Sequence, residues 1–430
     1  MPRAELEKLQ LEKLKHITKY CYDNVPLYKR KFDEAGFDCT KIKALSDIQY
    51  IPYTTKSDFR DNYPFGMFAT PLKNVTRLHA SSGTTGKQTV VGYTAHDIDV
   101  WAECAARALT NIGGTKDDYV QVCYGYGLFT GGLGMHYGTE KLGATVIPAS
   151  AGNSLRQLEM FRDFGTSIIC MTPSYAISLI ELMHEKGFKK EDFNLKAGLF
   201  GAEPWTDEMR KQIEDGLGIN AYDIYGLSEV MGPSVSAECQ YKCGMHICED
   251  HFIAEVIDPD TLEVLPAGQQ GELVFTCITK EALPLIRYRT RDIATLIYDK
   301  CECGRTHIRM LKPQGRTDDM LIIRGVNVFP SQIESALLSV DEKATNYLLV
   351  VDRVNNLDTL EIQLETRPDM FGDGVKTLEN YTKRVKTAID SAIGVGINVK
   401  LLEPKTLARS MGKAVRVQDN RAIKNKFEKK

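Results

Sequence analysis

The sequence predicts an α/β protein in which a large N-terminal domain of layered sheets and helices precedes a small mobile C-terminal α/β domain that acts as a lid. Between residues 78 and 225, short apolar runs alternate with helical patterns, which is typical of strands separated by helices. From about residue 249, strand-like runs are split by turn sequences such as Asp258-Pro259-Asp260, which indicates a β-rich subdomain. Residues 316–430 again mix strand and helix patterns.

In chain order, the first 75 residues are expected to form helices and turns that lead up to the first strand. The later strands are expected at 89–93, 118–124, 144–148, 167–172, 197–201, 252–257, 271–277, 293–298, 347–352 and 360–365. The helices are expected at 95–112, 154–164, 174–186, 331–338 and 378–393. A length of 430 residues favours more than one domain. The N-terminal domain is therefore expected at 1–315, with a helical lead-in at 1–75 and the β-rich subdomain at about 249–314, and the lid domain at 316–430.

The composition excludes several classes of function. Hydrophobic residues make up 43% and charged residues 26% of the chain, which is ordinary for a soluble globular protein. A formal net charge of −3 gives no electrostatic reason to expect nucleic acid as a partner. No run of about 18 apolar residues occurs, and charged residues interrupt the first 16 residues. Neither a membrane span nor a signal peptide is expected, so the expected location is the cytoplasm.

A loop rich in glycine and hydroxyl residues precedes the strand expected at 89–93. It reads Ser81-Ser82-Gly83-Thr84-Thr85-Gly86-Lys87. Small residues let the backbone approach a polyphosphate closely, while the hydroxyl groups and the lysine supply donors and positive charge. A Walker loop would need glycine at position 81 and serine or threonine at position 88, where this chain has Ser81 and Gln88. A phosphate-binding loop of another kind is favoured over a plain Gly/Ser/Thr turn.

This loop and three later segments resemble the motifs of adenylate-forming enzymes, the family that includes acyl-CoA synthetases, luciferases and peptide-synthetase adenylation domains. The segments follow one another in the order that the family has, at Ser82–Lys87, Tyr225–Glu229, Gly315–Asp319 with Ile323–Gly325, and Arg409–Lys413. A finer resemblance is to the short phenylacetate–CoA ligase branch of the family. It lies in the total length and in the segments Tyr124–Gly132, Arg287–Asp292 and Arg324–Pro330.

The resemblance implies a reaction and a nucleotide site. An acid and ATP would form an acyl-adenylate and pyrophosphate, after which CoA would take the acyl group as a thioester and AMP would leave. Glu229 is implied to bind Mg²⁺, which prefers oxygen ligands, and Lys87 to act with it in catalysis. The residues implied to bind the nucleotide are Ser81, Ser82, Gly83, Thr84, Thr85, Gly86, Ala202, Glu203, Pro204, Asp223, Ile224, Tyr225, Gly226, Ser228, Asp292 and Arg316.

The lid domain is implied to serve both half-reactions. Lys413, in a Ser-Met-Gly turn, would bind the substrate carboxylate and the α-phosphate and so favour the charge arrangement of the first transition state. The lid would then rotate about the hinge residue Asp318, and Arg324 and Gly325 would help to form a tunnel for CoA. The alternative for Lys413 is one more basic residue in a basic tail.

The pocket for the acid is expected beside a glycine-rich segment. Tyr124, Tyr126 and Phe129 offer aromatic walls, the neighbouring glycines leave space for a flat ring, and Gly201 would line the same pocket. The alternative is that the aromatic residues belong to the core. An arylacetic acid fits the resemblance best, while indoleacetic, hydroxyphenylacetic and benzoic acids stay open.

Five of the eleven cysteines fall in two short segments, Cys239, Cys243 and Cys248 in the first and Cys301 and Cys303 in the second. In a reducing compartment such local clustering favours a metal site over disulfides. Three thiolates and one imidazole satisfy tetrahedral zinc and close the site, which makes such a site structural. By resemblance to relatives with a similar pattern, the ligands are Cys239, His246, Cys301 and Cys303. Cys243 has the better spacing to Cys239 for a zinc site and is an alternative to His246; reduced cysteines without metal are the other possibility.

The resemblance implies an ATP-dependent aryl-acid CoA ligase of the phenylacetate type, with ATP, Mg²⁺ and coenzyme A as cofactors and zinc as a structural ion. The expected partners are these small molecules and a second copy of the chain in a homodimer, without nucleic acid or membrane. One alternative is an adenylyltransferase that acts on a deazaflavin cofactor or a carrier-protein thiol. Another is a non-catalytic regulator that binds nucleotide or acyl groups.

Overall fold

The chain forms two compact units in a computed structural model. The structure describes residues 1–430 except 82–87, 318–320, 325, 355–356, 368–374, 409–414 and 422–430, and the side chains of 322, 327, 375 and 376 are also not described. The first unit consists of Met1–Met171, Lys189–Ala202 and Ile219–Pro313, and the second of Thr172–Phe188, Glu203–Gly218 and Gln314–Lys430. The boundary between residues 315 and 316 stays a prediction; the second unit begins near it and also takes in two earlier segments.

The first unit begins with helices, as the sequence predicts. They are α1 (Arg3–Asn24), α2 (Pro26–Ala35) and α3 (Lys56–Asp61), with 3₁₀ turns at Cys39–Lys41, Leu45–Tyr50 and Leu72–Asn74. At the start of α1, Arg3 donates to both carboxylate oxygens of Glu249 at 2.8 and 2.7 Å. The hydroxyl of Thr306 donates to the carbonyl of Met1 at 2.7 Å. The first turn of the chain is therefore fixed to residues that come 246 and 305 positions later.

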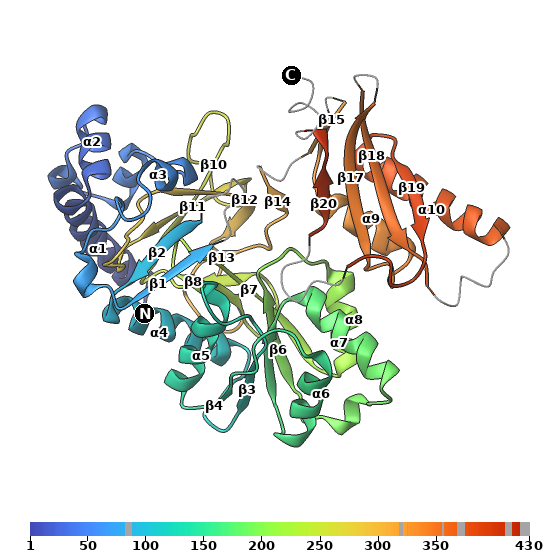
Figure 1. Ribbon diagram of the computed structural model, residues 1–430. Coiled ribbons are helices and arrows are strands. Elements are labelled where there is room, and N and C mark those ends of the chain that lie inside the picture. The colour runs from blue at the N-terminus through green and yellow to red at the C-terminus, as the bar shows by residue number, and fades with distance from the viewer. Residues whose placement is uncertain are drawn as a thin grey trace. The chain divides into compact units, whose positions relative to one another are not determined.

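A large mixed sheet runs through the first unit (Figure 1). Its strands pair in the order β10-β11-β12-β13-β9-β8-β7-β6-β5-β3-β4. The parallel part holds β3 (Tyr119–Val122), β4 (Thr145–Ile147), β5 (Ile168–Met171), β6 (Ala197–Gly201) and β7 (Asn220–Leu227). The antiparallel part holds β8 (Gly232–Glu238), β9 (Met245–Ile247), β10 (Phe252–Ile257), β11 (Gln270–Cys277), β12 (Tyr288–Ile297) and β13 (Arg309–Met310). The β-rich strands predicted from about residue 249 thus exist, but they continue the sheet of the α/β region.

The strand expected at 293–298 is longer than predicted and begins at Tyr288. Along β12 the residues alternate strictly between buried and half-exposed, and Arg289 and Arg291 lie on the half-exposed side. Arg289 Nη2 lies 2.6 Å from the Glu272 carboxylate of the neighbouring strand β11. Cross-strand pairing of this kind allows charged residues within a strand. The arginines had therefore hidden the first part of β12 in the sequence.

Helices of the first unit precede or connect its parallel strands. They are α4 (Ala95–Asn111), which leads from the hairpin before it into β3, α5 (Thr130–Leu142), which connects β3 to β4, and α6 (Ser154–Asp163), which connects β4 to β5. A 3₁₀ turn lies at Lys190–Asp192. α4 begins with a capping box, in which Thr94 Oγ1 accepts from the Asp97 amide and the Asp97 carboxylate accepts from the Thr94 amide. α4 and α5 pack closely because Gly138 has no side chain: a Cβ there would lie 2.3 Å from the Cβ of Ala105.

A two-stranded hairpin carries the predicted phosphate loop. β1 (Arg77–Ser81) pairs antiparallel with β2 (Thr89–Tyr93), and the ladder runs from Arg77 opposite Tyr93 to Ser81 opposite Thr89. The predicted loop residues 82–87 connect the two strands and lie outside the described residues. The hairpin therefore fixes where the loop begins and ends.

The second unit contains a four-stranded sheet in the order β19-β18-β17-β20. Its elements in the C-terminal part are β14 (Gly315–Arg316), β15 (Leu321–Ile323), β16 (Val326–Val328), α9 (Pro330–Val340), β17 (Tyr347–Val354), β18 (Leu357–Glu365), α10 (Val375–Ile393), β19 (Asn398–Leu402) and β20 (Val417–Asp419). Apolar residues of α9, α10 and the inner strands, among them Leu337, Val385 and Ile362, form one core. Two earlier helices, α7 (Pro173–Glu185) and α8 (Asp207–Leu217), belong to the same unit.

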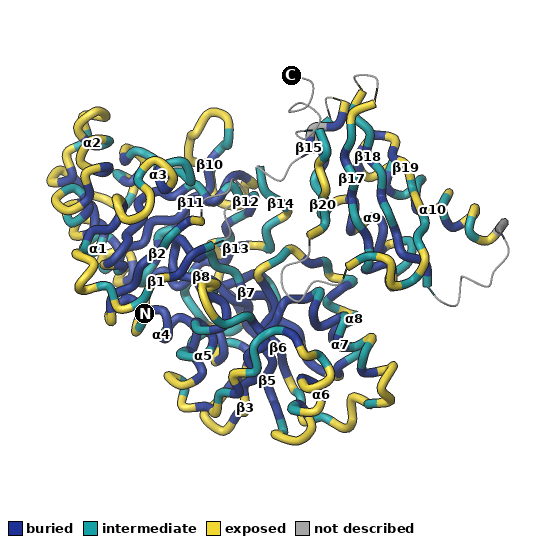
Figure 2. The backbone as a smooth tube through the Cα atoms, in the orientation of Figure 1, coloured by how far each residue is buried: buried dark blue, intermediate teal, exposed yellow. Residues whose placement is uncertain are grey.

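Burial follows the layered arrangement. All residues of β5 and β6 are buried, as their dark blue course in Figure 2 shows, while exposed residues gather in loops and on outer helix faces. A strand buried on both faces reads as a continuous apolar run, which is how these strands were predicted. Within the described ranges, no helix is both long and apolar enough to cross a membrane.

One buried arginine holds the N-terminal lead-in against the sheet. Arg287 is 2% exposed and forms two hydrogen bonds with the Glu255 carboxylate, at 3.0 and 2.9 Å. Its guanidinium also donates to the carbonyls of Gln49 and Ile51 at 2.7 and 3.0 Å, and to the hydroxyl of Tyr53 at 2.7 Å. A single side chain therefore satisfies main-chain and charged acceptors from two regions of the chain.

Replacing this arginine should destabilise the protein. In Arg287→Met the Glu255 carboxylate loses its charged partner while it stays buried, and breaking a buried pair in this way costs about 3–5 kcal/mol. The matched control is Arg30→Met, since the Arg30–Glu34 pair is exposed and 4.0 Å apart, and should cost less than about 1 kcal/mol. Urea unfolding followed by circular dichroism measures both. Equal stability of the two variants would contradict this account of Arg287.

Candidate functional site

Two neighbouring parallel strands bring several predicted nucleotide residues together at their carboxyl ends, where open α/β sheets bind ligands. The register of β6 and β7 pairs Phe200 with Asp223 and Gly201 with Ile224. A Cβ at Gly201 would lie 2.2 Å from the Ile224 carbonyl oxygen, so only glycine allows this approach. Ala202 then leaves the strand in a left-handed conformation, with φ of 70°.

Tyr225 and Asp292 connect β7 to β12. The hydroxyl of Tyr225 donates to Asp292 Oδ2 at 2.5 Å, and Asp292 is 5% exposed. The Tyr225 ring stacks on the Phe275 ring with a centroid distance of 6.2 Å. The two residues were predicted to contact one nucleotide although they are 67 positions apart, and the structure brings them into direct contact.

The polar groups around Asp223 fix the middle of β7. The amide of Asp223 donates to Glu238 Oε2 at 2.8 Å, and its carboxylate lies 3.8 Å from Lys312 Nζ. Further along the strand, a Cβ at Gly226 would lie 1.8 Å from the carbonyl oxygen of Gly232. Glycine at this position lets β7 and β8 close on each other.

The turn after β7 carries Glu229, the predicted magnesium residue, which is 5% exposed. The amides of Val230 and Met231 both donate to the Leu227 carbonyl at 3.1 Å. The carbonyls of the next four residues accept hydrogen bonds from side chains. The Tyr93 hydroxyl donates to the carbonyls of Ser228 and Met231 at 3.1 and 3.0 Å. The Lys280 ammonium group donates to the carbonyls of Glu229 and Val230, each at 3.0 Å.

Sequence reasoning missed Lys280 and Tyr93. Lys280 is 0% exposed, and its ammonium group lies 4.7 Å from the centre of the Tyr93 ring. Burial lowers the pKa of the Lys280 ammonium group, while the charges of Cys277, Asp97 and Glu229 raise it. The available signal was one lysine directly after the apolar and neutral stretch from Leu273 to Thr279, but a lysine in a predicted loop is normally solvated.

The predicted acid pocket is divided between core and surface. Tyr124 is 4% exposed and belongs to the same core as Val122 and Met135, as the alternative interpretation had it. Phe129 is 44% exposed. Tyr126 is half-buried, and its hydroxyl lies 3.3 Å from His136 Nδ1.

The start of α5 connects this segment to the turn that carries Glu229. The hydroxyls of Thr130 and Ser228 lie 2.9 Å apart, and both residues are buried. Since Thr130 lies within the glycine-rich segment Tyr124–Gly132, one hydrogen bond links the predicted acid pocket to the predicted magnesium turn.

Several predicted site residues lie in the second unit. Glu203 accepts a hydrogen bond from the Ser174 amide at the start of α7, at 2.7 Å, and Pro204 follows it. Arg316 is half-exposed in β14. Arg324 has a φ of 51°, and its guanidinium donates to the carbonyls of Asp358 and Gly396 at 3.1 and 2.7 Å.

The remaining predicted site residues lie outside the described ranges: Ser82, Gly83, Thr84, Thr85, Gly86, Lys87, Asp318, Gly325 and Lys413. Ser81 is described and ends β1. Its Oγ is buried and, among the described residues, has no hydrogen-bond partner. An unsatisfied hydroxyl at the first position of the predicted phosphate loop is consistent with a ligand acceptor there.

Four predicted metal ligands come together beside β9 and β13. The ligand atoms of Cys239, His246, Cys301 and Cys303 all lie within 4.8 Å of one another. The Cys239 and Cys301 sulfurs are 3.7 Å apart, and the Cys303 sulfur lies 3.3 Å from His246 Nε2. Ligands around a tetrahedral zinc ion would lie about 3.5–3.8 Å apart. The described side chains therefore fit a closed zinc site.

The protonation state of His246 agrees with the same chemistry, whereas Cys239 would need a bound cation to ionise. Burial lowers the pKa of His246 to about 4, so its imidazole is neutral at pH 7, as a metal ligand requires. His246 Nδ1 lies 3.4 Å from the His307 carbonyl, which leaves Nε2 for a metal. Burial raises the pKa of Cys239 to about 12, and a bound cation would favour its thiolate.

Cys243, the alternative ligand, lies beside the cluster. Its sulfur is 3.5 Å from that of Cys301 and accepts a hydrogen bond from Arg309 Nη1 at 2.8 Å. The same guanidinium nitrogen donates to the Cys243 carbonyl at 2.6 Å. His246 completes the described cluster, and Arg309 is the described partner of Cys243.

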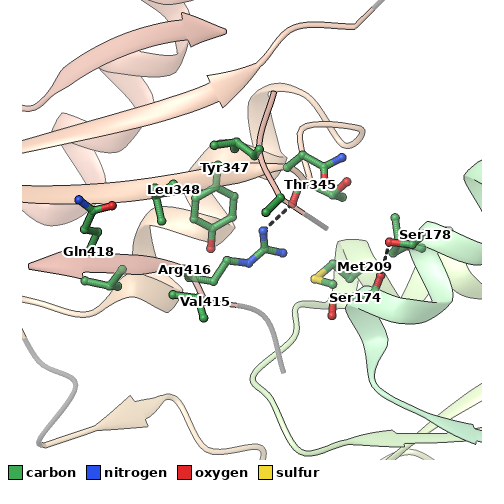
Figure 3. Close-up of a pocket in the computed structure, with 14 residues that line it drawn as sticks. Ser174, Ser178, Met209, Thr345, Tyr347, Leu348, Val415, Arg416 and Gln418 are labelled. Carbon is green, nitrogen blue, oxygen red and sulfur yellow. Dashed lines mark hydrogen bonds between the residues drawn. The ribbon is translucent and has the colours of Figure 1, made fainter. Parts of the chain in front are cut away.

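A separate cavity of about 480 Å³ lies within the second unit (Figure 3). Its walls include Ser174, Ser178 and Met209 from α7 and α8, and Arg416, which donates to the Thr345 carbonyl at 2.8 Å. None of its lining residues was predicted to bind nucleotide, acid or CoA.

The sheet, the strand-end residues and the C-terminal unit define an adenylate-forming type of enzyme fold. The family description "AMP-binding enzyme" matches residues 15–277, and "AMP-binding enzyme C-terminal domain" matches residues 325–421. The chain belongs to the AMP-binding enzyme family, in the group of the phenylacetate–coenzyme A ligases, which confirms the resemblance found in its motifs.

Curated relatives match nearly the whole chain. The phenylacetate-coenzyme A ligase of Pseudomonas putida is 51% identical over 97% of this chain and 94% of its own length. That of Escherichia coli strain K12 is 49% identical over 97% of this chain and 96% of its own length. Among solved structures, a 2-hydroxyisobutyryl-CoA ligase with 2-HIB-AMP in the postadenylation state has a TM-score of 0.91 and 30% identity, covering 100% of this chain and 92% of the other.

Proposed function

We propose that this protein is an ATP-dependent ligase that joins an aryl acid of the phenylacetate type to coenzyme A. An acyl-adenylate forms first, with release of pyrophosphate, and the thioester forms second, with release of AMP. The observation that carries the proposal is the 51% identity to a phenylacetate-coenzyme A ligase, which extends over 97% of the chain and so includes both compact units. The contact between Tyr225 and Asp292 supports a nucleotide site at the strand ends.

In the first half-reaction a carboxylate oxygen of the acid bonds to the α-phosphorus of ATP, and the bond to pyrophosphate breaks. The protein has to position the reactants and neutralise negative charge. Bound Mg²⁺ would neutralise phosphate charge, and Glu229 offers the oxygen ligand it prefers. The roles proposed for Asp292, Arg316 and the loop residues 81–87 are to bind ribose and phosphates.

Lys413 is proposed to bind the acid carboxylate and the α-phosphate in this step. For the second half-reaction, the proposed hinge is Asp318 and the proposed CoA-binding residues are Arg324 and Gly325. The sulfur of CoA attacks the acyl carbon and AMP leaves. The hydrogen bonds of Arg324 to two carbonyls of the second unit support a role in shaping a wall rather than as a mobile charge.

Of the three aromatic residues, Tyr126 is the main one in the proposed acid pocket. It is half-buried, whereas Tyr124 is in the core and Phe129 is exposed. The hydrogen bond between Thr130 and Ser228 places the end of this segment beside the proposed magnesium turn. Such a position suits an acid whose carboxylate must reach the α-phosphate.

Structural zinc at Cys239, His246, Cys301 and Cys303 is part of the proposal and is supported by the fit of their ligand atoms to a tetrahedral site. A cytoplasmic location and a homodimer are also proposed. The apolar side of α1, with Leu6, Leu14 and Ile17, is buried within the chain. A dimer contact through this helix would therefore use its outer, polar side.

The reaction can be tested by ATP–pyrophosphate exchange. Phenylacetate should stimulate exchange more strongly than acetate or a long-chain fatty acid, and AMP release should require both the aryl acid and CoA. The exchange rate would be measured as the transfer of labelled pyrophosphate into ATP, for each member of a panel of aryl and alkyl acids. AMP release that needs a deazaflavin or a carrier protein instead of CoA would favour the alternative adenylyltransferase.

Lys413 can be tested by separating the two half-reactions. Lys413→Ala should slow acyl-adenylate formation by about 100-fold or more, the usual effect of removing one charge-stabilising group, and should spare thioester formation from pre-made adenylate. The matched control is Lys405→Ala in the same basic tail, since Lys405 is exposed and lies 3.5 Å from Glu185. Equal loss of both half-reactions in Lys413→Ala would argue against this division of labour.

The zinc site can be tested by metal content. Protein purified without chelators should contain about one zinc per chain by mass spectrometry of the metal, and Cys301→Ser should lose it with a fall in melting temperature. Cys39→Ser is the control because Cys39 is also buried but lies in the N-terminal lead-in, outside the cluster. Wild-type protein without zinc, or equal zinc loss in both variants, would rule out a structural zinc at this cluster.

A further inference from the structure

The main-chain carbonyls of the turn from Ser228 to Met231 accept hydrogen bonds from side chains in two distant parts of the chain. All four of its residues are at most 8% exposed, so water does not satisfy its carbonyls. Tyr93 lies 135 positions from Ser228 in the sequence, and Lys280 lies 51 positions from Glu229. Cys277 Sγ adds a weaker contact to the Val230 carbonyl at 3.4 Å.

Lys280 is an unusual residue for this position. Burying an ammonium group is costly unless good acceptors surround it. Its described hydrogen bonds go to the carbonyls of Glu229 and Val230, each at 3.0 Å, and its charge faces the ring of Tyr93 at 4.7 Å. Three donors on one nitrogen allow it to bond adjacent carbonyls at once. The peptide group of Glu229 is therefore fixed directly by this cation.

Tyr93 joins the turn to the hairpin of the predicted phosphate loop. It is the last residue of β2, whose other end pairs Thr89 with Ser81. The Tyr93 hydroxyl is shared between the carbonyls of Ser228 and Met231, at 3.1 and 3.0 Å. The strand that leaves the phosphate loop thus ends on the turn that carries Glu229.

The segment that carries Lys280 is itself braced. The Asp97 carboxylate accepts from the amides of Glu281 and Ala282 at 2.7 and 2.9 Å, and also from the Thr94 amide at 2.9 Å. Thr94 Oγ1 donates back to the Glu281 carboxylate at 2.8 Å. The lysine therefore projects from a main chain that is tied to the start of α4.

We propose that Lys280 and Tyr93 are positioning residues for magnesium–nucleotide binding, because they hold the main chain of the Ser228–Met231 turn and so fix the Glu229 carboxylate at the carboxyl end of β7. The inference rests on the proposed role of Glu229. It adds that the affinity for the magnesium–nucleotide complex depends on two residues that contact the main chain of the turn rather than its carboxylate.

The test compares Lys280→Met and Tyr93→Phe with Tyr28→Phe. Tyr28 is a suitable control because it is also 0% exposed and its hydroxyl is also hydrogen-bonded, at 3.1 Å to Thr54 and 3.3 Å to the Pro284 carbonyl, away from the turn. All three variants lose buried hydrogen bonds and should lose some stability. Only the first two should change the turn.

Two readouts need neither acid nor CoA. In the ligand-free protein, hydrogen exchange at the amides of Val230 and Met231 should be about tenfold faster in Lys280→Met and Tyr93→Phe than in wild type or Tyr28→Phe. The Mg²⁺ concentration that gives half of the ATP-induced rise in melting temperature should also increase about tenfold in these two variants. Tyr93→Phe keeps the test open if Lys280→Met does not fold.

Glu229→Gln separates the two possible failures. If Glu229→Gln raises the Mg²⁺ requirement while Lys280→Met and Tyr93→Phe behave like Tyr28→Phe, the positioning role is wrong and the role of Glu229 stands. If Glu229→Gln leaves the Mg²⁺ requirement unchanged, both the role of Glu229 and the inference are overturned.

Discussion

Main-chain carbonyls in a buried turn must find donors inside the protein, and this constraint organises the first unit around the end of β7. The donors come from Tyr93 on the hairpin of the predicted phosphate loop and from Lys280 after β11. Thr130 at the start of α5 bonds the side chain of Ser228 in the same turn. Segments that are far apart in the sequence are therefore brought to one point by hydrogen bonds that no single secondary-structure element could supply.

The antiparallel half of the sheet serves a different purpose from the parallel half. The parallel strands β6 and β7 present polar residues at their ends, where a nucleotide is proposed to bind. The antiparallel strands place Asp292 against Tyr225 and also bring His246 opposite Arg309, close to Cys301. One continuous sheet thus supports both the proposed nucleotide site and the cysteine–histidine cluster. The lead-in helix and the buried Arg287 both contact its antiparallel side.

Much of this arrangement could be predicted from the sequence because glycine and hydroxyl residues mark places where the backbone must approach closely. Gly201 and Gly226 are needed where β6, β7 and β8 meet. Gly226 lies in the recognisable segment Tyr225–Glu229, and Gly201 was expected beside the acid pocket. The cluster of Cys239, His246, Cys301 and Cys303 was predicted from the resemblance to relatives with a similar pattern. That the described group of four contains His246 depends on the pairing of β9 with β13, which spacing along the chain does not reveal.

Other features depended on tertiary contacts that the sequence does not encode locally. Lys280 looks like an exposed loop residue until its carbonyl acceptors are known. The start of β12 was hidden by arginines that are neutralised across strands, as Arg289 is by Glu272. Tyr124 belongs to the core although it lies in a glycine-rich segment that suggested an open pocket.

The anchoring of the first helical turn has a consequence for how the chain reaches its native state during synthesis. Arg3 and Met1 bond to Glu249 and Thr306. These contacts of the first helical turn can therefore form completely only after Thr306 has been synthesised, since contacts so distant along the chain close late. In that interval α1 can already pack against α2 and the 3₁₀ turns that follow it, so the helix gains its local partners before its first turn is anchored.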